Sequence, residues 1–434
     1  MGTAYSVPRR VFRRVDGAGC PHCFAPSTQP CAFIPIVAAR HAKSRLLTLA
    51  ICVAALPACA QLPASGAWSS TDRPLFQAEI SRVEKLLASA PDKAAVTYLL
   101  ARTWAAGKQW PETIEWLRKV ANRKAGLDPS RDSAFAELSG TREFEEILAV
   151  VREATPAVSH SSVAFQVAEG DLVPESVAYD PKGGRFYFGS IPKGKVVRCS
   201  RSGDCTEFAR GLGVVLGLKV HGQGLWLLSN SDTESALIHY DLASARVVRK
   251  YSVAGAGHNF NDLAVAATGD IYLTDTRGAA VWRLAPGADK LTKLPGQFEA
   301  ANGIALSSDG RLLYVSVFPD GIDVVDLKTQ AVTPIARPAG LCLAMIDGLY
   351  YHRGALIAIQ NGFMSPRVVR FALTHDRRGI ERFEVLERRN PLFDGVTTGV
   401  LVGNEFFYMA NIQDEKKSGF HPITILKLSL TGRA

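Results

Sequence analysis

The chain has 434 residues, of which 47% are hydrophobic and 21% charged, and its formal net charge is +9. This composition is typical of a globular protein with a sizeable core and excludes a largely disordered chain. Seven Lys and Arg residues but one acidic residue lie in residues 1–60, so this segment carries +6 and the remainder +3. Because no basic stripe with interleaved aromatic residues follows, nucleic-acid binding is excluded.

Residues 1–60 are predicted to be a leader that contains a signal peptide. A basic stretch precedes an apolar h-region at residues 46–58, which is too short to span a bilayer. Two processing schemes stay open: cleavage after Ala60 at an A-x-A-like site, or lipidation of Cys59 at a lipobox-like sequence. Both predict an exported protein, periplasmic or lipid-anchored in a bacterial envelope, whose only membrane contact is a lipid on Cys59.

Residues 71–157 have the periodicity of amphipathic helices, with apolar residues three and four positions apart. Pro111 marks a helix start, and Gly107 and Gly126 mark helix ends. The run YLLARTWAAGKQWPETIEWLRKV resembles a tetratricopeptide-type helical hairpin, although only one such unit is visible. Two interpretations remain: a small helical cap without a partner of its own, or a surface that binds a protein partner.

Residues 162–434 contain one phrase six times, in which a polar or small residue precedes two apolar alternating runs separated by a turn. The spacings between successive phrases lie between 41 and 51 residues, and the first residues are Glu175, Leu216, Asn261, Asn302, Asp347 and Thr398. Short strands repeated at this period predict a β-propeller with one four-stranded blade per repeat, and therefore six blades. The last blade lacks one strand, which we expect residues 162–168 to supply, since an open ring would expose its edges.

Three of the eight cysteines follow the leader. Cys199 and Cys205 flank the turn-like sequence SRSGD between two strand-like runs, so we expect them to form a disulfide. Cys342 is expected to be a buried, inert thiol.

Four of the six opening residues carry side-chain oxygen donors: Glu175, Asn261, Asn302 and Asp347. A single Asn-Gly or Asp-Gly pair is an ordinary turn former, but these four share one position in four repeats. Carboxylates that converge at the mouth of a propeller would repel each other unless a cation or proton neutralised them. Carboxylate and amide oxygens without Cys or His favour Ca²⁺, with another divalent cation as the alternative.

The phrases PESVAYDP, FNDLAV, ANGIALSSDGRLLYVS and IDGLYY resemble blade openings of the regucalcin/gluconolactonase (senescence marker protein) group and, more distantly, of the paraoxonases. The resemblance covers roughly residues 165–430. It implies an all-β six-bladed propeller in which Glu175, Asn302 and Asp347 ligate the metal. It also implies that Asn261 binds metal or substrate and that Asp347 activates water.

The chain departs from this group at two positions. Asn259 stands where gluconolactonase-type members have an arginine that holds the sugar acid, so Asn259 is a candidate for substrate binding and a sugar lactone is disfavoured. Gly348 follows Asp347, where paraoxonases have a second asparagine. His258 is a candidate proton shuttle, the alternative being a solvated loop histidine, since nothing in the sequence shows a partner for it. Asp262, Asp275 and Glu405 are expected to bracket the site, although capping of the strand turn is an alternative role for Asp262.

The resemblance and the oxygen donors together predict a metal-dependent hydrolase of a lactone or ester. In this scheme the metal polarises the carbonyl and Asp347 positions or deprotonates water. The chain contains no Gly-x-Ser-x-Gly elbow, which argues against a serine mechanism of the α/β-hydrolase type. The alternative is a non-catalytic propeller scaffold with a structural calcium, in which the helical domain docks a protein partner.

Overall fold

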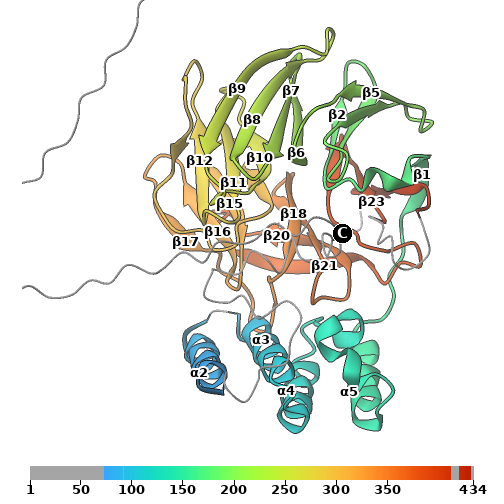
Figure 1. Cartoon of the computed structure of the whole chain (residues 1–434), viewed down its shortest axis with the longest axis vertical. Helices are drawn as coiled ribbons and strands as arrows, with labels where there is room; N and C mark the ends of the chain where they lie inside the picture. Colours follow the sequence, from blue (N-terminus) through green and yellow to red (C-terminus); the bar gives the residue numbers. More distant parts are fainter. Residues whose placement is uncertain (1–72, 91, 412–419, 432–434) are drawn as a thin grey trace, which may run out of the picture. The chain divides into compact units, whose positions relative to one another are not determined.

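The computed structural model describes residues 73–90, 92–411 and 420–431, and its elements are labelled in Figure 1. The predicted leader, with its h-region and Cys59, lies outside the described residues. None of the helices in the described ranges is both long and apolar enough to cross a membrane.

Four α-helices precede the strands, and they coincide with the four helical segments expected from the sequence: α2 (Arg73–Ser89), α3 (Lys93–Ala106), α4 (Trp110–Asn122) and α5 (Arg142–Ala154). Asp92 fixes the start of α3 because its side chain accepts a hydrogen bond from the amide of Ala95. Pro111 lies in the first turn of α4, where its missing N–H costs nothing. Two short 3₁₀ helices, η3 (Pro129–Arg131) and η4 (Ser133–Leu138), connect α4 to α5. The tetratricopeptide character of this segment stays a prediction.

The strands form six antiparallel four-stranded sheets, so the predicted six-bladed β-propeller is confirmed. In each of the first three blades the strands follow chain order from the inside outward: β2 (Val177–Asp180), β3 (Arg185–Gly189), β4 (Val196–Cys199) and β5 (Cys205–Ala209); β6 (Val214–His221), β7 (Gly224–Asn230), β8 (Glu234–Asp241) and β9 (Val247–Ala254); β10 (Phe260–Val265), β11 (Ile271–Asp275), β12 (Ala280–Leu284) and β13 (Thr292–Lys293). A 3₁₀ turn, η5 (Gly170–Leu172), precedes the first of them.

The fourth and fifth blades have the same order: β14 (Ile304–Leu306), β15 (Leu312–Val317), β16 (Gly321–Asp326) and β17 (Val332–Pro334); β18 (Ile346–His352), β19 (Ala355–Gln360), β20 (Arg367–Leu373) and β21 (Ile380–Arg388). The sixth blade has β22 (Gly399–Val402), β23 (Glu405–Met409) and β24 (Ile423–Ser429) from this end of the chain, and β1 (Ser162–Val167) is its outermost strand. Residues 162–167 pair with β24 along their length, which confirms the predicted closure of the ring.

Three of the opening residues lie at irregular points within the innermost strands, and the other three, Glu175, Asn302 and Thr398, come just before theirs. The register of the inner strand shifts around Leu216, Asn261 and Asp347, which therefore lie in β-bulges. A bulge interrupts the alternation of side chains along a strand and changes the direction in which they point. A Cβ at Gly303 would come within 2.6 Å of the Asp347 carbonyl oxygen, so glycine permits the close approach of two neighbouring blades.

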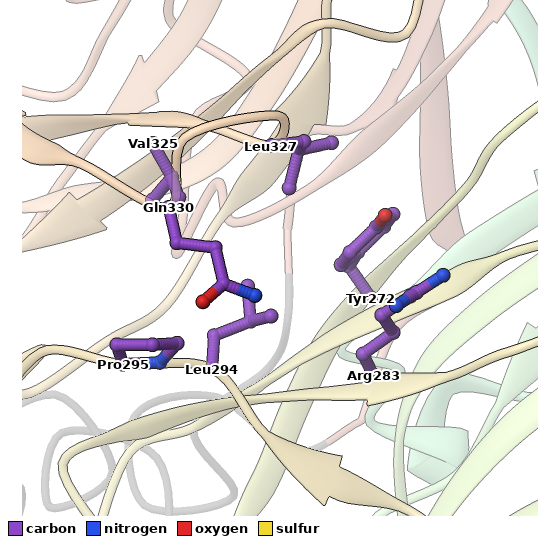
Figure 2. Close-up of a pocket in the computed structure, with 7 residues that line it drawn as sticks. All are labelled: Tyr272, Arg283, Leu294, Pro295, Val325, Leu327 and Gln330. Carbon is purple, nitrogen blue, oxygen red and sulfur yellow. The ribbon is translucent and has the colours of Figure 1, made fainter.

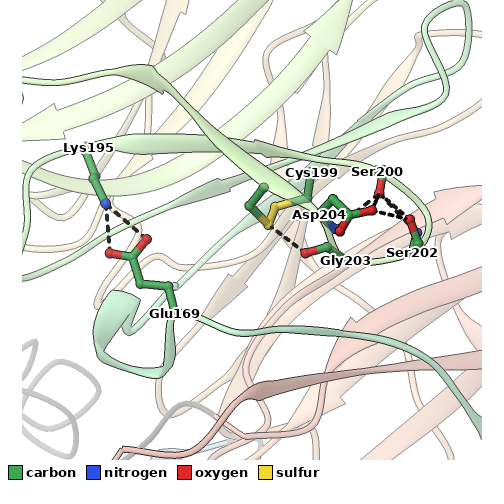
Figure 3. Close-up of a disulfide and its surroundings, with 8 residues drawn as sticks. Glu169, Lys195, Cys199, Ser200, Ser202, Gly203 and Asp204 are labelled. Carbon is green, nitrogen blue, oxygen red and sulfur yellow. Dashed lines mark hydrogen bonds and ion pairs between the residues drawn. A yellow bond between two sulfur atoms is a disulfide. The ribbon is translucent and has the colours of Figure 1, made fainter.

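A disulfide joins Cys199 and Cys205, as the sequence predicted (Figure 3). The two residues face each other across strands β4 and β5 with their Cα atoms 4.0 Å apart. Cys342 is a buried free thiol, as expected, and burial raises its pKa.

Replacing Cys199 and Cys205 by serine is expected to lower the free energy of unfolding by about 2 kcal/mol, because the bond closes only a short loop in the unfolded chain. Urea denaturation of the double variant measures this change. Wild-type protein under reducing conditions is the matched comparison and should shift equally. An unchanged midpoint in both would contradict the expected contribution.

The helices share a hydrophobic core with the fifth blade. Tyr98, Phe135 and Phe144 of the helical segment pack in one buried cluster with Cys342 and Phe363. Hydrogen bonds join the same two parts: Asp92 Oδ2 accepts from the Leu343 amide at 2.9 Å, and the Asp128 amide donates to the Phe363 carbonyl oxygen at 2.7 Å. The helical segment is therefore fixed to the loops that precede β18 and follow β19.

Candidate functional site

Asp347 lies at the centre of the candidate site. Its side chain is in the bulge of β18 and the residue is only 6% exposed. Oδ1 accepts a hydrogen bond from Asn302 Nδ2 at 2.9 Å, and Oδ2 accepts one from Asn361 Nδ2 at 2.6 Å. The structure thus brings two of the predicted ligands, Asn302 and Asp347, into direct contact from adjacent blades.

Glu175 contributes the second carboxylate of the site. Burial, and after it the negative charge of Asp347, holds the pKa of Glu175 well above its ordinary value. Burial likewise raises the pKa of Asp347 to about 6 against the opposing effect of its two amide donors, and the charge of Asp262 adds to the rise. Carboxylates whose pKa values are raised by burial and by neighbouring negative charge form a region that favours a proton or a cation.

Asn361 is a site residue that the sequence reasoning missed. Its Nδ2 donates to Asp347 Oδ2 and also to the Val396 carbonyl oxygen at 3.0 Å. Both neighbours are acceptors, so the orientation of the amide is fixed and Oδ1 must point elsewhere. That Oδ1 atom is buried and has no hydrogen-bond partner among the described residues. A bound cation or a ligand donor would satisfy it.

A cavity of about 30 Å³ adjoins these side chains. It is lined by Thr276, Ala300, Asn302, Ser316, Val317, Phe318, Met345, Ile346, Asp347 and Asn361. Three of them share a position that the sequence analysis did not consider, since Thr276, Phe318 and Asn361 come directly after the second strand of their blades. That register is readable in the sequence and is the signal by which Asn361 can be found.

Asn261 joins the site indirectly. Its Nδ2 donates to Thr276 Oγ1 at 3.0 Å, and Thr276 in turn donates to the Ala301 carbonyl oxygen at 2.6 Å. Asn261 is half-buried but is not one of the residues that line the cavity. Its assignment as a ligand of metal or substrate therefore stays a prediction.

His258 and Asn259 are both held by the buried carboxylate of Asp275. His258 Nδ1 lies 2.6 Å from Asp275 Oδ2, and the Asn259 amide donates to Asp275 Oδ1 at 2.9 Å. The structure thus shows a partner for His258 that the sequence did not reveal, because β11 presents Asp275 to it. Neither residue lines the cavity, although Asn259 Oδ1 is buried without a partner among the described residues. Their roles in proton transfer and substrate binding stay predictions.

The three acidic residues expected to bracket the site have different environments. Glu405 pairs with Val402 at the far end of the β22–β23 hairpin from Thr398 and forms an ion pair with Lys427, so its expected place beside the site is wrong. Asp275 is fully buried, and its carboxylate is hydrogen-bonded to His258 and to the Asn259 amide. Asp262 remains near the axis, where Lys219 Nζ lies 3.6 Å from its Oδ1 atom.

The donor set fits a hard cation better than a soft one. No group of three or more His, Cys, Asp or Glu residues converges anywhere in the described ranges. The candidate site instead combines two carboxylates, Glu175 and Asp347, with the amides of Asn302 and Asn361. Oxygen donors of this kind suit calcium, and the unpaired Asn361 Oδ1 is consistent with a missing positive partner.

A second cavity, of about 80 Å³, lies between the third and fourth blades (Figure 2). Its lining residues are Tyr272, Arg283, Leu294, Pro295, Val325, Leu327 and Gln330. None of the predicted site residues is among them, and the lining contains no carboxylate. The smaller cavity beside Asp347 is therefore the candidate site.

The raised pKa of Asp347 predicts a pH-dependent effect of the Asp347→Asn substitution on the metal-free protein. Between the ordinary Asp pKa near 3.8 and the folded value of about 6, the folded state keeps a proton that the unfolded state has lost. The free energy of unfolding of wild type therefore falls as the pH rises through this window. Relative to wild type, we expect the variant to gain about 2 kcal/mol between pH 4 and pH 7.

Urea denaturation with chelator at the two pH values measures this gain. Any pH-independent cost of the substitution cancels in the comparison. A difference between the variant and wild type that stays constant from pH 4 to pH 7 would contradict the assigned burial of this carboxylate.

The fold and the site define a class: a six-bladed β-propeller with oxygen donors gathered where neighbouring inner strands begin. Residues 173–340 match the family described as the SMP-30/Gluconolactonase/LRE-like region. This match spans the first four blades. The first four blades of this chain are therefore similar to the SMP-30/gluconolactonase/LRE-like family, in line with the resemblance of the blade openings.

Solved structures with a similar fold are distant. A gluconolactonase from Xanthomonas campestris is 17% identical over 63% of this chain and 95% of its own, with a TM-score of 0.44. A calcium-binding regucalcin from Agrobacterium tumefaciens is 18% identical over 62% and 96%, with a TM-score of 0.43. An aldose sugar dehydrogenase from Streptomyces coelicolor is 16% identical over 63% and 99%, with a TM-score of 0.46. No curated protein is similar enough to count as a match. Nothing about activity follows from similarities at this level.

Proposed function

We propose that this protein is a calcium-dependent hydrolase that acts on a lactone or ester. The observation that carries the proposal is the environment of Asp347: a buried carboxylate held by two amide donors, beside a second carboxylate and an unpaired amide oxygen. Glu175, Asn302 and Asp347 would hold the ion, with Asn361 Oδ1 as a further oxygen donor. When bound, calcium would polarise the carbonyl of the substrate.

Asp347 has the properties that a general base needs. In the metal-free protein its pKa of about 6 lies close to neutral pH, so the carboxylate is ionised there yet retains affinity for a proton. Asp347 would take a proton from a water molecule whose oxygen attacks the acyl carbon. The bond between that carbon and the ester oxygen breaks, and the leaving oxygen receives the proton held at Asp347. Asn302 and Asn361 keep the carboxylate in place through both of its oxygen atoms.

The test is a panel of aliphatic and aromatic lactones and esters, assayed with purified protein before and after chelation. We expect turnover that is lost with chelator and recovered with added Ca²⁺. Turnover that survives complete removal of divalent cations would contradict the metal-dependent scheme. No turnover across the panel by the calcium-loaded protein would favour the alternative of a non-catalytic scaffold with a structural calcium.

Export is also part of the proposal. The leader in residues 1–60 supports a periplasmic or lipid-anchored protein, and the Cys199–Cys205 disulfide is compatible with an oxidising compartment.

Metabolic labelling of expressed protein with a palmitate analogue distinguishes a lipid on Cys59 from cleavage after Ala60. A protein partner of the helical segment remains a second proposal, which affinity capture with the mature protein addresses.

A further inference from the structure

Half of the wall of the cavity beside Asp347 is apolar, and the wall has no positively charged side chain. Five of its ten lining residues have apolar side chains: Ala300, Val317, Phe318, Met345 and Ile346. No Lys, Arg or His is among the lining residues, and Asp347 is the single ionisable group. A substrate carboxylate would find no cationic side chain here, and sugar hydroxyl groups that contact the apolar half of the wall would be buried against carbon.

The cavity is also small. Its volume of about 30 Å³ exceeds the roughly 10–15 Å³ that one water molecule needs, but it cannot enclose a large acyl group. Space for the reacting carbonyl and its water is therefore available only if the groups around that carbonyl are compact.

Aromatic contacts connect the wall to helix α3. The rings of Phe318 and Phe363 lie edge to face with their centroids 6.4 Å apart, and Phe363 stacks on Tyr98 at 4.8 Å. The guanidinium carbon of Arg102 lies 4.6 Å from the centroid of the Phe363 ring. Phe318 and Met345 both pack against the hydrophobic cluster that the helices build. Phe318 and Met345 of the wall therefore pack against the helical core and not against solvent.

Backbone hydrogen bonds hold the same loops. The Phe363 carbonyl oxygen accepts from Asp128, the Leu343 amide donates to Asp92, and the Asn361 amide donates to the Met345 carbonyl oxygen at 3.1 Å. Because a packed interior resists expansion, the wall cannot move away to admit a larger group without disturbing the helices.

We infer that the site takes the lactone or ester of a compact, uncharged, largely nonpolar acyl group, and that the Phe318–Met345 wall, supported by Tyr98 of α3 through Phe363, sets the upper size limit. This inference rests on the proposed hydrolase function. It gives the helical segment a role in specificity, because the contacts that fix the wall come from α3 and the residues around it.

The experiment compares γ-lactones that carry alkyl groups from methyl to heptyl, together with an aldonolactone, in the calcium-loaded full-length mature protein. For wild type we expect kcat/KM to fall at least about tenfold from methyl to heptyl, and the aldonolactone to be the poorest substrate. Phe318→Ala and Met345→Ala should each raise the heptyl-to-methyl ratio of kcat/KM about tenfold. Because Met345 is half-buried, Met345→Ala provides a second test of the wall if Phe318→Ala fails to fold.

Phe208→Ala is the matched control, since Phe208 is a buried phenylalanine in a different core cluster between the first two blades. It should leave the ratio unchanged. A preference of wild type for the aldonolactone, or an unchanged ratio in both wall variants, would overturn the inference.

Binding of 5-alkyl γ-lactams, measured by calorimetry, separates this inference from the proposed function. Lactams resist hydrolysis but present a similar ring and carbonyl. If no lactone is hydrolysed yet short-chain lactams bind and Phe318→Ala admits long-chain ones, the hydrolase proposal fails and the size limit stands. If lactones are hydrolysed but lactam affinity does not depend on chain length in any variant, the size limit fails and the hydrolase stands.

Discussion

Asp347→Asn is expected to lower kcat for lactone or ester hydrolysis by at least about 10³-fold, since it removes both the base and one negative ligand of the cation. The substitution keeps the size of the side chain, so the fold should be retained. However, two amide donors, from Asn302 and Asn361, would then face an amide that can accept through only one atom. Calcium affinity should fall together with kcat.

Steady-state kinetics and calcium titration of the purified variant test this expectation. Asp376→Asn is the control, because Asp376 is an exposed turn carboxylate that accepts from Thr374 and Arg378. The control should keep wild-type turnover. Retention of more than about a tenth of wild-type kcat by Asp347→Asn would exclude Asp347 as the base.

Asp92→Ala is expected to lower the free energy of unfolding by about 3 kcal/mol. Asp92 is 3% exposed and serves two parts of the molecule at once. Its Oδ1 accepts from Ala95 at the start of α3, while its Oδ2 accepts from the Leu343 amide and lies 3.5 Å from Arg337 Nη1. Removal would leave a buried amide and a buried guanidinium without this partner.

Urea denaturation followed by fluorescence measures the effect. Asp92→Asn keeps the capping oxygen but not the charge, so it should be destabilised less than the alanine variant. Because Leu343 lies two residues before Met345 of the cavity wall, Asp92→Ala should also weaken discrimination by acyl size in folded protein. A loss of less than about 1 kcal/mol would show that the helices contribute little to holding these loops.

The repeated phrase in the sequence predicted the number of blades because every blade must place the same kinds of strand at the same spacing. The contact between Asn302 and Asp347 could also be predicted, since both residues occupy the opening position of adjacent repeats. The closing strand was predictable from a count of strands in the last repeat. In each case the same structural role recurs in every blade, so the residues that serve it recur in the sequence at the same spacing.

Other features depend on contacts that the sequence does not show. The position of Asn361 directly after the second strand of its blade is readable in the sequence, but the contacts of its Nδ2 with Asp347 and the Val396 carbonyl oxygen are not. The support of the cavity wall by α3 depends on contacts between residues more than 200 positions apart, such as Asp92 and Leu343. The partner of His258 likewise lies on a neighbouring strand, at Asp275. Contacts between single side chains that are far apart in the chain do not repeat, so no periodic pattern in one sequence predicts them.

The central claim is that Glu175, Asn302 and Asp347 hold one divalent cation at the mouth of the propeller. Calorimetric titration of Ca²⁺ into chelator-treated protein tests it most directly, with Glu175→Gln and Asp347→Asn titrated in parallel. The account predicts one ion per wild-type chain and an affinity at least about tenfold weaker in each variant, because each loses a charged ligand. Absence of calcium binding by wild type, or equal affinity in all three proteins, would contradict it.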